Sequence, residues 1–273
     1  NHRMPTSPLT NALVTGASSG LGHEIVRQLV LDRDMTVLAT ARRRDHLEQL
    51  ADSLPPGKVV ILDGDLANSQ FRHELWQFAE DRLGRIDLLV NNAGLGNYAK
   101  FEHQDESVIS AILNLNVTAL IDLTQRAILH MKPRGSGQIL QVSSVLGDVG
   151  IPYSAVYVAS KHAVNGLVKS LRYELRGTGV RLWAACPGRT ESEFSRQALG
   201  PDRASAKLHG AEPTEQVVRA ILRGLDRDRA FLYPSWRARI SRDLLTYLPA
   251  PLNRLLVQWA TQHIRRTIEG QGK

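Results

Sequence analysis

Residues 12–22 read ALVTGASSGLG, a short apolar run that passes into a loop with three glycines. The run predicts a buried strand, and the apolar residues at helical spacing after Gly20 predict a helix that follows the loop directly. Gly16 permits a tight turn, Gly20 lets the backbone approach a pyrophosphate, and Gly22 allows close packing of helix against strand. The free N–H groups at the start of such a helix favour a phosphate group. We therefore interpret the stretch as a strand–loop–helix unit that binds a dinucleotide, with Ser18, Ser19 and Leu21 as further contacts.

Outward from this unit, strand and helix patterns alternate along the chain. Further strands are predicted at residues 36–39, 59–62, 86–90, 138–142, 180–185 and 231–234, and helices at 45–54, 71–83, 106–131, 153–176 and 213–225. The strands are apolar on both faces, as buried parallel strands are. Repeated β-α-β units predict an α/β fold, a doubly wound Rossmann-type parallel sheet with helices on both faces. We expect a disordered or tag-derived segment at 1–9, one catalytic domain over 10–235, and a C-terminal helical extension of that domain over 236–273.

Composition narrows the class of protein. The chain has 273 residues, of which 42% are hydrophobic and 22% charged, and no apolar run approaches the roughly 20 residues of a membrane span. The single cysteine, Cys186, cannot form an intrachain disulfide, so we expect a reduced, cytoplasmic setting. The histidines lack metal-ligand spacing, and we expect no metal site. The net charge of +7 comes without a basic run interleaved with aromatics, so we expect no nucleic-acid partner.

The end of the second predicted strand bears on the choice of cofactor. An NAD-binding protein places a carboxylate there for the ribose 2′-hydroxyl. In this sequence Ala41 occupies the place, and Arg42 and Arg43 follow. A guanidinium fork suits a 2′-phosphate, so we expect NADP(H) to be preferred over NAD(H). The alternative is a basic helix start that is simply solvated.

Five further segments lie at or near the ends of the predicted strands. They are Asn91-Asn92-Ala93-Gly94, Leu115-Asn116-Val117, Ser143-Ser144, Tyr157-Val158-Ala159-Ser160-Lys161 and Pro187-Gly188. Together with the T-G-x-x-x-G-x-G loop, and over roughly residues 10–195, they resemble the short-chain dehydrogenase/reductase family in its Y-x-x-x-K branch. The resemblance implies an enzyme that acts on the CH-OH group of donors. Such an enzyme transfers a hydride between NADP(H) and a small-molecule carbonyl compound or secondary alcohol.

Tyr157 and Lys161 are the candidate proton-transfer pair. They are four residues apart and share one helix face. The unperturbed pKa of a phenol is about 10, and a nearby ammonium lowers it by stabilising the phenolate. Tyr157 would then donate a proton to a carbonyl or accept one from an alcohol. Without other signals, a core tyrosine beside a surface lysine is the commoner explanation of such a pair.

Ser144 changes that judgement, because it lies at the C-terminal end of a strand, where ligands of open α/β sheets bind. A hydroxyl at that edge can hydrogen-bond a substrate oxygen as charge develops on it. Ser143 competes for the role, but strand neighbours point in opposite directions, and the spacing in the family selects Ser144. The resemblance adds that Lys161 also bonds the nicotinamide ribose and that Asn116 helps to hold a proton-relay water.

The resemblance also implies contacts with the cofactor. Ser18 and Arg42 would lie near the 2′-phosphate, and Thr190 departs mildly from the family, which more often has an aliphatic residue there. The remaining contacts would be Asp65 and Leu66 beside the adenine, Asn92, Ala93 and Gly94 along the adenosine and ribose, and Pro187, Gly188 and Thr190 over the nicotinamide.

Apolar residues before Tyr157 and after the sixth strand bear on the substrate. They favour an apolar substrate and are Val145, Leu146, Val149, Ile151 and Tyr153 before Tyr157, and Phe194, Leu199 and Leu208 after the sixth strand. In 236–273, apolar residues interleave with arginines, and Pro249 and Pro251 divide two predicted amphipathic helices. This tail serves either core or subunit packing, with a homodimer or homotetramer expected, or peripheral contact with an anionic membrane.

Two functions fit the motifs. The first is an NADPH-dependent carbonyl reductase or alcohol dehydrogenase. The second is a non-catalytic NADP-binding, redox-sensing module on the same fold. The presence of Asn116, Ser144, Tyr157 and Lys161 together favours the enzyme, because a sensor does not need them.

Overall fold

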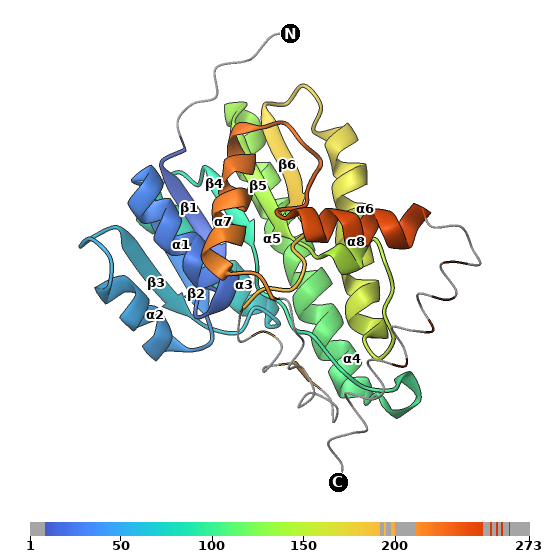
Figure 1. Ribbon diagram of the computed structural model, residues 1–273. Helices are drawn as coiled ribbons and strands as arrows, with labels where there is room; N and C mark the ends of the chain where they lie inside the picture. Colours follow the sequence, from blue (N-terminus) through green and yellow to red (C-terminus); the bar gives the residue numbers. More distant parts are fainter. Residues whose placement is uncertain are drawn as a thin grey trace.

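The computed structural model describes residues 9–191, 194, 198–199 and 211–247 and the isolated positions 252, 255, 258 and 262. Its centre is a seven-stranded sheet of parallel strands in the order β3-β2-β1-β4-β5-β6-β7 (Figure 1). The strands are β1 (Asn11–Thr15), β2 (Thr36–Ala41), β3 (Val59–Asp63), β4 (Leu88–Asn91), β5 (Gly137–Val142), β6 (Val180–Ala185) and β7 (Phe231–Leu232). The order reverses between β1 and β4, and ligands of such sheets bind at the carboxyl ends of the strands at this point.

Helices cover both faces of the sheet, which confirms the predicted doubly wound fold. Buried residues of α1 (Gly20–Arg33), α2 (Arg44–Asp52) and α7 (Thr214–Leu222) pack on one face, and those of α3 (Ser69–Leu83), α5 (Leu120–Met131) and α6 (Ala155–Glu174) on the other. The remaining helices are α4 (Glu106–Leu113), α8 (Trp236–Tyr247), the π-helix η2 (Asn114–Ala119) and short 3-10 helices at Phe101–His103, Lys132–Arg134, Val145–Gly147 and Arg223–Asp226.

Strand β1 divides its side chains between two cores. Ala12 and Val14 belong to the core under α1, α2 and α7, whereas Leu13 belongs to the core under α3, α5 and α6. All three are fully buried. Because successive strand residues point to opposite faces, a strand buried on both sides must be apolar throughout, as the sequence of β1 is.

The helix predicted over 106–131 differs from the expectation in one respect. Six residues, Asn114–Ala119, form a π-helix between α4 and α5. The segment Glu106–Arg134 contains an 18-residue window with a mean hydropathy of 1.5, and it is long and apolar enough to cross a bilayer by length and composition alone. Core helices of globular proteins pass the same test, and here Leu123, Ala127 and Met131 pack in the core against the sheet.

The C-terminal region is described only in part. Helix α8 (Trp236–Tyr247) supplies the first of the two predicted amphipathic helices. The predicted helix breakers Pro249 and Pro251, the pocket residue Leu208 and most of the second predicted helix lie outside the described residues. Strand β7 is two residues long, shorter than the predicted 231–234, and pairs with Ala184 and Ala185 of β6.

Candidate active site

A cleft of about 780 Å³ opens at the carboxyl ends of the strands. Its lining comes from the segments that follow β1, β2, β3, β4, β5 and β6, and from α6. Every residue assigned to catalysis or cofactor binding from the sequence lines this cleft except Gly22 and Asn116. The two exceptions lie behind the lining, where each is packed against residues that do reach it.

The glycine loop is shaped as a cofactor cradle. Gly16 and Gly20 have φ values of +67° and +57°, which L side chains rarely adopt. A Cβ on Gly22 would lie 2.2 Å from the carbonyl oxygen of Gly16 and 2.4 Å from Nδ2 of Asn92. Asn92 secures the loop, because its Nδ2 donates to the carbonyl oxygens of Thr15 (3.0 Å) and Gly16 (3.1 Å). The loop and the N-terminus of α1 therefore fit the pyrophosphate of a dinucleotide.

The β2 end of the cleft is cationic. Strand β2 ends at the buried Ala41, and the exposed Arg42 and the half-buried Arg43 follow it into the cleft lining. One guanidinium nitrogen of Arg43 lies 3.3 Å from Oγ of Ser18. Two guanidinium groups and a hydroxyl thus line the place where an NAD-binding protein has a carboxylate, and this set fits a phosphate group.

The catalytic candidates meet where β5 ends and α6 begins. Lys161 is buried, its Nζ donates to the carbonyl oxygen of Val142 at 2.9 Å, and the same Nζ lies 5.6 Å from the centre of the Tyr157 ring. The Ser144 hydroxyl lies beside the Tyr157 phenol and stabilises its anion. Ser143 points elsewhere and donates from Oγ to Oδ1 of Asn165 at 2.7 Å.

The pKa values differ from the expectation for the pair. Burial raises the pKa of Tyr157 well above its ordinary value, and only the Ser144 hydroxyl opposes this effect. Burial also lowers the pKa of Lys161 to about 8. The pKa of Tyr157 is therefore raised where a lowering by Lys161 was expected, because desolvation of the phenol dominates. At neutral pH Tyr157 holds its proton, as a general acid must.

Asn116 lies in the π-helix, behind the cleft. Its Oδ1 accepts from the N–H of Leu95 at 2.8 Å, and its Nδ2 donates to the carbonyl oxygen of Leu95 at 2.8 Å and to Oγ of Ser160 at 3.0 Å. The side chain is fully buried. Asn116 therefore joins the loop after β4 to the helix that carries Tyr157 and Lys161.

Sequence reasoning missed Asn97, which is buried in the loop after β4. Its Oδ1 accepts from the N–H of Tyr157 at 3.2 Å, and its Nδ2 donates to Oε1 of Gln104 at 2.7 Å. The carbonyl oxygen of Asn97 also accepts from Oγ of Ser154, at the start of α6, at 3.0 Å. A residue sixty positions away in the sequence thus caps the first turn of the helix that carries Tyr157, and local sequence patterns hold no signal for it.

Tyr98 and Arg189 also line the cleft and were not predicted. Tyr98 acts electrostatically on the phenol of Tyr157 and on the guanidinium of Arg189, so it lies between these two residues in the cleft lining. Phe194, which was predicted as a substrate-pocket residue, stacks at a tilt on Tyr157 with the ring centres 5.6 Å apart. Arg189 follows the predicted Pro187-Gly188 motif directly, and that position was the signal available in the sequence.

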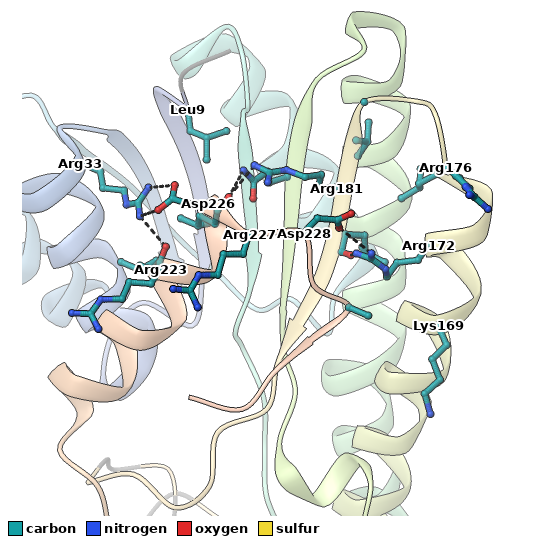
Figure 2. Close-up of a pocket in the computed structure, with 18 of the residues that line it drawn as sticks. Leu9, Arg33, Lys169, Arg172, Arg176, Arg181, Arg223, Asp226, Arg227 and Asp228 are labelled. Carbon is teal, nitrogen blue, oxygen red and sulfur yellow. Dashed lines mark hydrogen bonds and ion pairs between the residues drawn. The ribbon is translucent and has the colours of Figure 1, made fainter. Parts of the chain in front are cut away.

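A second cleft, of about 1750 Å³, lies at the opposite edge of the sheet, beside the amino ends of β5 and β6. Eight cationic side chains and three aspartates line it, and Figure 2 shows two ion pairs among them, Arg33 with Asp226 (2.7 Å) and Arg172 with Asp228 (2.9 Å). No residue assigned to catalysis or cofactor binding from the sequence lines this cleft. It is therefore separate from the Tyr157 site.

The chain matches known proteins over most of its length. Residues 10–201 match the family profile described as short chain dehydrogenase. Ketoacyl reductase HetN of Nostoc is 34% identical over 226 residues, which cover 81% of this chain and 77% of that protein. The 3alpha-hydroxysteroid dehydrogenase of Mediterraneibacter gnavus is 34% identical over 186 residues, which cover 67% of this chain and 74% of that protein.

Solved structures give the same result for the fold. A short-chain dehydrogenase from Sphingobium yanoikuyae in complex with NADPH has a TM-score of 0.77 at 27% identity, over 92% of this chain and 96% of that chain. A member from Burkholderia phymatum in complex with NAD has a TM-score of 0.81 at 20% identity, over 88% and 94%. With the strand order, the glycine cradle and the Ser144–Tyr157–Lys161 arrangement, these matches show that the chain belongs to the short-chain dehydrogenase/reductase family of oxidoreductases.

Proposed function

We propose that this protein is an NADP(H)-dependent oxidoreductase that interconverts a carbonyl compound and a secondary alcohol, with Tyr157 as the acid and base. The observation that carries the proposal is the meeting of Ser144, Tyr157 and Lys161 at the end of a cleft that also holds the glycine cradle. When bound, NADP(H) supplies or accepts the hydride. The residues of the chain then bind the substrate oxygen and move the proton.

Each residue has one task in carbonyl reduction. The Ser144 hydroxyl donates to the substrate oxygen as negative charge develops on it. The Tyr157 phenol gives its proton to that oxygen, and the raised pKa of Tyr157 keeps the proton available at neutral pH. Charged Lys161 stabilises the phenolate left behind, and in alcohol oxidation the proton moves the other way.

Turnover with a panel of ketones and alcohols, followed by NADPH absorbance, tests the proposal. We expect Tyr157→Phe to lose about 10²- to 10⁴-fold in turnover while it retains NADPH binding. A non-catalytic redox sensor would show no turnover of any substrate by the unchanged protein, with NADPH binding intact. Turnover that survives Tyr157→Phe undiminished would contradict the assignment of Tyr157.

The preference for NADP(H) is supported by Ala41, Arg42, Arg43 and Ser18 at the β2 end of the cleft. We expect kcat/KM to be higher with NADPH than with NADH, and Arg42→Asp to narrow the gap, since a carboxylate repels a 2′-phosphate and can accept from a 2′-hydroxyl. Equal kcat/KM values with NADPH and NADH in the unchanged protein would contradict the proposed preference for NADP(H).

An apolar body of the substrate is supported by the cleft lining near Tyr157. Leu95, Val145, Leu146, Ile151 and Phe194 present apolar side chains there. The relatives named as a ketoacyl reductase and as hydroxysteroid dehydrogenases are named for substrates with largely apolar frameworks. We therefore expect KM to fall as the hydrocarbon part of a ketone grows.

The outer face of α8 bears on where in the cell the protein acts. Ala238 is buried beside Gly188, whereas Trp236, Ile240, Leu244 and Tyr247 form an exposed row at helical spacing. Arginines flank this row at 237 and 239. We propose that the row docks a cytoplasmic protein on an anionic membrane surface, where apolar substrates dissolve.

Flotation with vesicles that contain anionic lipid tests the docking. The triple variant Trp236→Ser, Ile240→Ser and Leu244→Ser should lose flotation, and Leu31→Ser, an exposed leucine of α1, should keep it. Equal flotation of all three proteins excludes membrane docking by this row. A smaller oligomer of the triple variant in light scattering assigns the row to subunit contact instead.

We also propose a homodimer or homotetramer. Leu113, Ile121 and Leu129 are exposed on α4 and α5. Exposed apolar side chains grouped on one helical surface mark interaction sites. Ile121→Asp with Leu129→Asp should reduce the molar mass measured by light scattering to that of a monomer.

A further inference from the structure

Arg189 places a cation in the catalytic cleft. It follows Gly188 directly, is half-buried, and lines the cleft together with Tyr98, Tyr157 and Phe194. Its backbone is held in place, since its carbonyl oxygen accepts from the N–H of Glu212 at 3.0 Å and Thr190 forms a parallel bridge with Glu212. The guanidinium thus extends from a backbone position that is held by contacts with Glu212.

The charge of Arg189 is poorly compensated. Burial lowers the pKa of its guanidinium, and the opposing influence comes from the hydroxyl of Tyr98, a neutral group. No carboxylate in the described part of the chain forms an ion pair with it. A desolvated cation without a counter-ion costs free energy, and an anion that binds beside it recovers part of that cost.

The arginines at the other edge of the sheet behave differently. Figure 2 shows Arg33 and Arg172 paired with Asp226 and Asp228, and both aspartates are exposed to water. Those guanidinium groups are compensated by carboxylates and solvent. Among the residues that the structure describes, Arg189 has no carboxylate partner, and it is only partly hydrated, so an anionic ligand would supply the counter-ion that these residues do not.

The neighbours of Arg189 tell which ligand. Arg189 lines the same cleft as Tyr98, Tyr157 and Phe194, and Phe194 stacks on the Tyr157 ring, so Arg189 belongs to the Tyr157 end of the cleft. The cationic β2 end, where Arg42 and Arg43 lie, is formed by different elements. An anion at Arg189 therefore belongs to the substrate and not to the adenosine end of the cofactor.

We propose that Arg189 binds an anionic head group of the substrate, at a distance from the reacting carbonyl, and that Tyr98 positions the guanidinium for this contact. The substrate class is then an oxo acid, or the corresponding hydroxy acid, with an apolar body between carbonyl and anion. The inference rests on the proposed reaction at Tyr157. A guanidinium fork accepts a carboxylate or a phosphate in the same bidentate manner, so the shared chemistry is a planar or tetrahedral oxyanion.

Matched substrates test the proposal. Medium-chain oxo acids are compared with their methyl esters and with keto-alkyl phosphates of equal length, by kcat and KM with NADPH. We expect Arg189→Met to raise the KM of the acid by about 10- to 100-fold, the effect of losing a charged hydrogen bond, while the ester changes little. Arg189→Lys should retain part of the preference for the acid. Tyr98→Phe should reduce that preference less than Arg189→Met does.

Arg223→Met is the matched control, because Arg223 is an exposed arginine of the second cleft. This variant also removes one positive charge, and it should leave the kcat and KM of both the acid and the ester unchanged. If kcat/KM is higher for the keto-alkyl phosphate than for the oxo acid, and both values fall in Arg189→Met, the natural anion is a phosphate. The proposal is overturned if the ratio of the KM of the acid to the KM of the ester is the same in Arg189→Met as in the unchanged protein. It is also overturned if weaker NADPH binding is the only defect of Arg189→Met.

Calorimetric binding of the oxo acid to the NADPH complex separates this proposal from the proposed reaction. If no ketone or ester is turned over, the reaction at Tyr157 is wrong. Binding of the acid that weakens in Arg189→Met still supports the anion site, and equal binding by both proteins overturns it.

Discussion

Lys161 is buried and Tyr157 is partly buried, and desolvation moves their pKa values in opposite directions. Burial disfavours whichever form carries charge, so the phenol keeps its proton and the ammonium loses its proton more easily. The spacing of the two residues in the sequence predicts that they share a helix face. It does not predict their degree of burial, which depends on residues far away in the chain, and for this reason the expected pKa of Tyr157 was wrong.

The lowered pKa of Lys161 has a consequence for pH dependence. Below about 8 the lysine is charged and can stabilise the phenolate, so kcat/KM for reduction should be flat there and fall as pH rises through about 8. An initial-rate profile between pH 6 and pH 10 measures this. A profile that stays flat beyond pH 9 would contradict the role of the charge.

Stability should follow the same group with a definite sign. Between about 8 and the ordinary lysine pKa of 10.5, the folded protein binds fewer protons at Lys161 than the unfolded chain, so the unfolding free energy rises with pH in that window. Lys161→Met should raise the unfolding free energy at pH 7 by about 1–2 kcal/mol while it abolishes turnover. Urea unfolding at pH 7 and pH 9.5 checks both signs.

Replacement of Asn97 should show how the position of the first turn of α6 affects turnover when the side chains of Tyr157 and Lys161 are unchanged. Asn97→Ala removes the partner of the Tyr157 N–H and of Gln104, and we expect a loss of about 1–2 kcal/mol in unfolding free energy and a lower kcat with nearly unchanged NADPH binding. Asn97→Asp keeps the acceptor at the helix start and should recover most of kcat. If both variants reduce kcat equally, Asn97 does not act through the helix start.

At the scale of elements, the period of apolar residues predicted most strands and helices, because the central strands are buried on both faces and the helices on one, whereas the edge strand β3 is only partly buried. The π-helix Asn114–Ala119 left no such trace, since one extra residue in a turn barely changes the apolar pattern over 106–131. The residues brought together by Asn116 come from three separate segments, and the pattern of any single segment cannot show their contact.

The turn between β1 and α1 gives a prediction with a built-in control. A Cβ on Gly22 would overlap the Gly16 carbonyl oxygen, whereas a Cβ on Gly166 in α6 meets nothing within 4 Å. Gly22→Ala should displace the loop, weaken NADPH binding by at least about 10-fold and lower Tm. Gly166→Ala should raise the unfolding free energy by about 0.5–1 kcal/mol through helix propensity and leave NADPH binding unchanged. Fluorescence titration and thermal unfolding of the two variants decide.

At the scale of the whole molecule, Asp148 joins elements that are far apart in sequence. It accepts from the Tyr233 hydroxyl, which follows β7, and from Nδ2 of Asn165 in α6 at 3.1 Å, and the Arg242 guanidinium of α8 lies over the Tyr233 ring. The overall fold followed from the sequence, but this connection did not, because it joins single residues of four separate segments, and the apolar period within one segment carries no information on such contacts.

Cofactor binding should stabilise the molecule as a whole, because the cleft draws on six strand ends. A ligand at a hundred times its Kd adds about 2.7 kcal/mol to the unfolding free energy, which raises Tm by roughly 5–10 °C in a chain of this size. At equal concentration NADPH should raise Tm more than NADH, and Arg42→Asp should reduce the difference. Equal shifts with both cofactors in the unchanged protein would contradict the assignment of Arg42 and Arg43 to a 2′-phosphate.

The loop after β4 bears on how the range of substrates can be redesigned. Its backbone is held at several points. The N–H of Leu95 donates to Oδ1 of Asn116. The backbone N–H groups of Tyr98 and Ala99 donate to the carbonyl oxygens of Leu199 and Tyr153, each at 2.9 Å. An insertion or deletion in this loop would displace the first turn of α6 and, with it, the Tyr157 hydroxyl. Mutational libraries should therefore keep the loop length fixed and vary the side chains at 98, 189 and 194, which line the cleft.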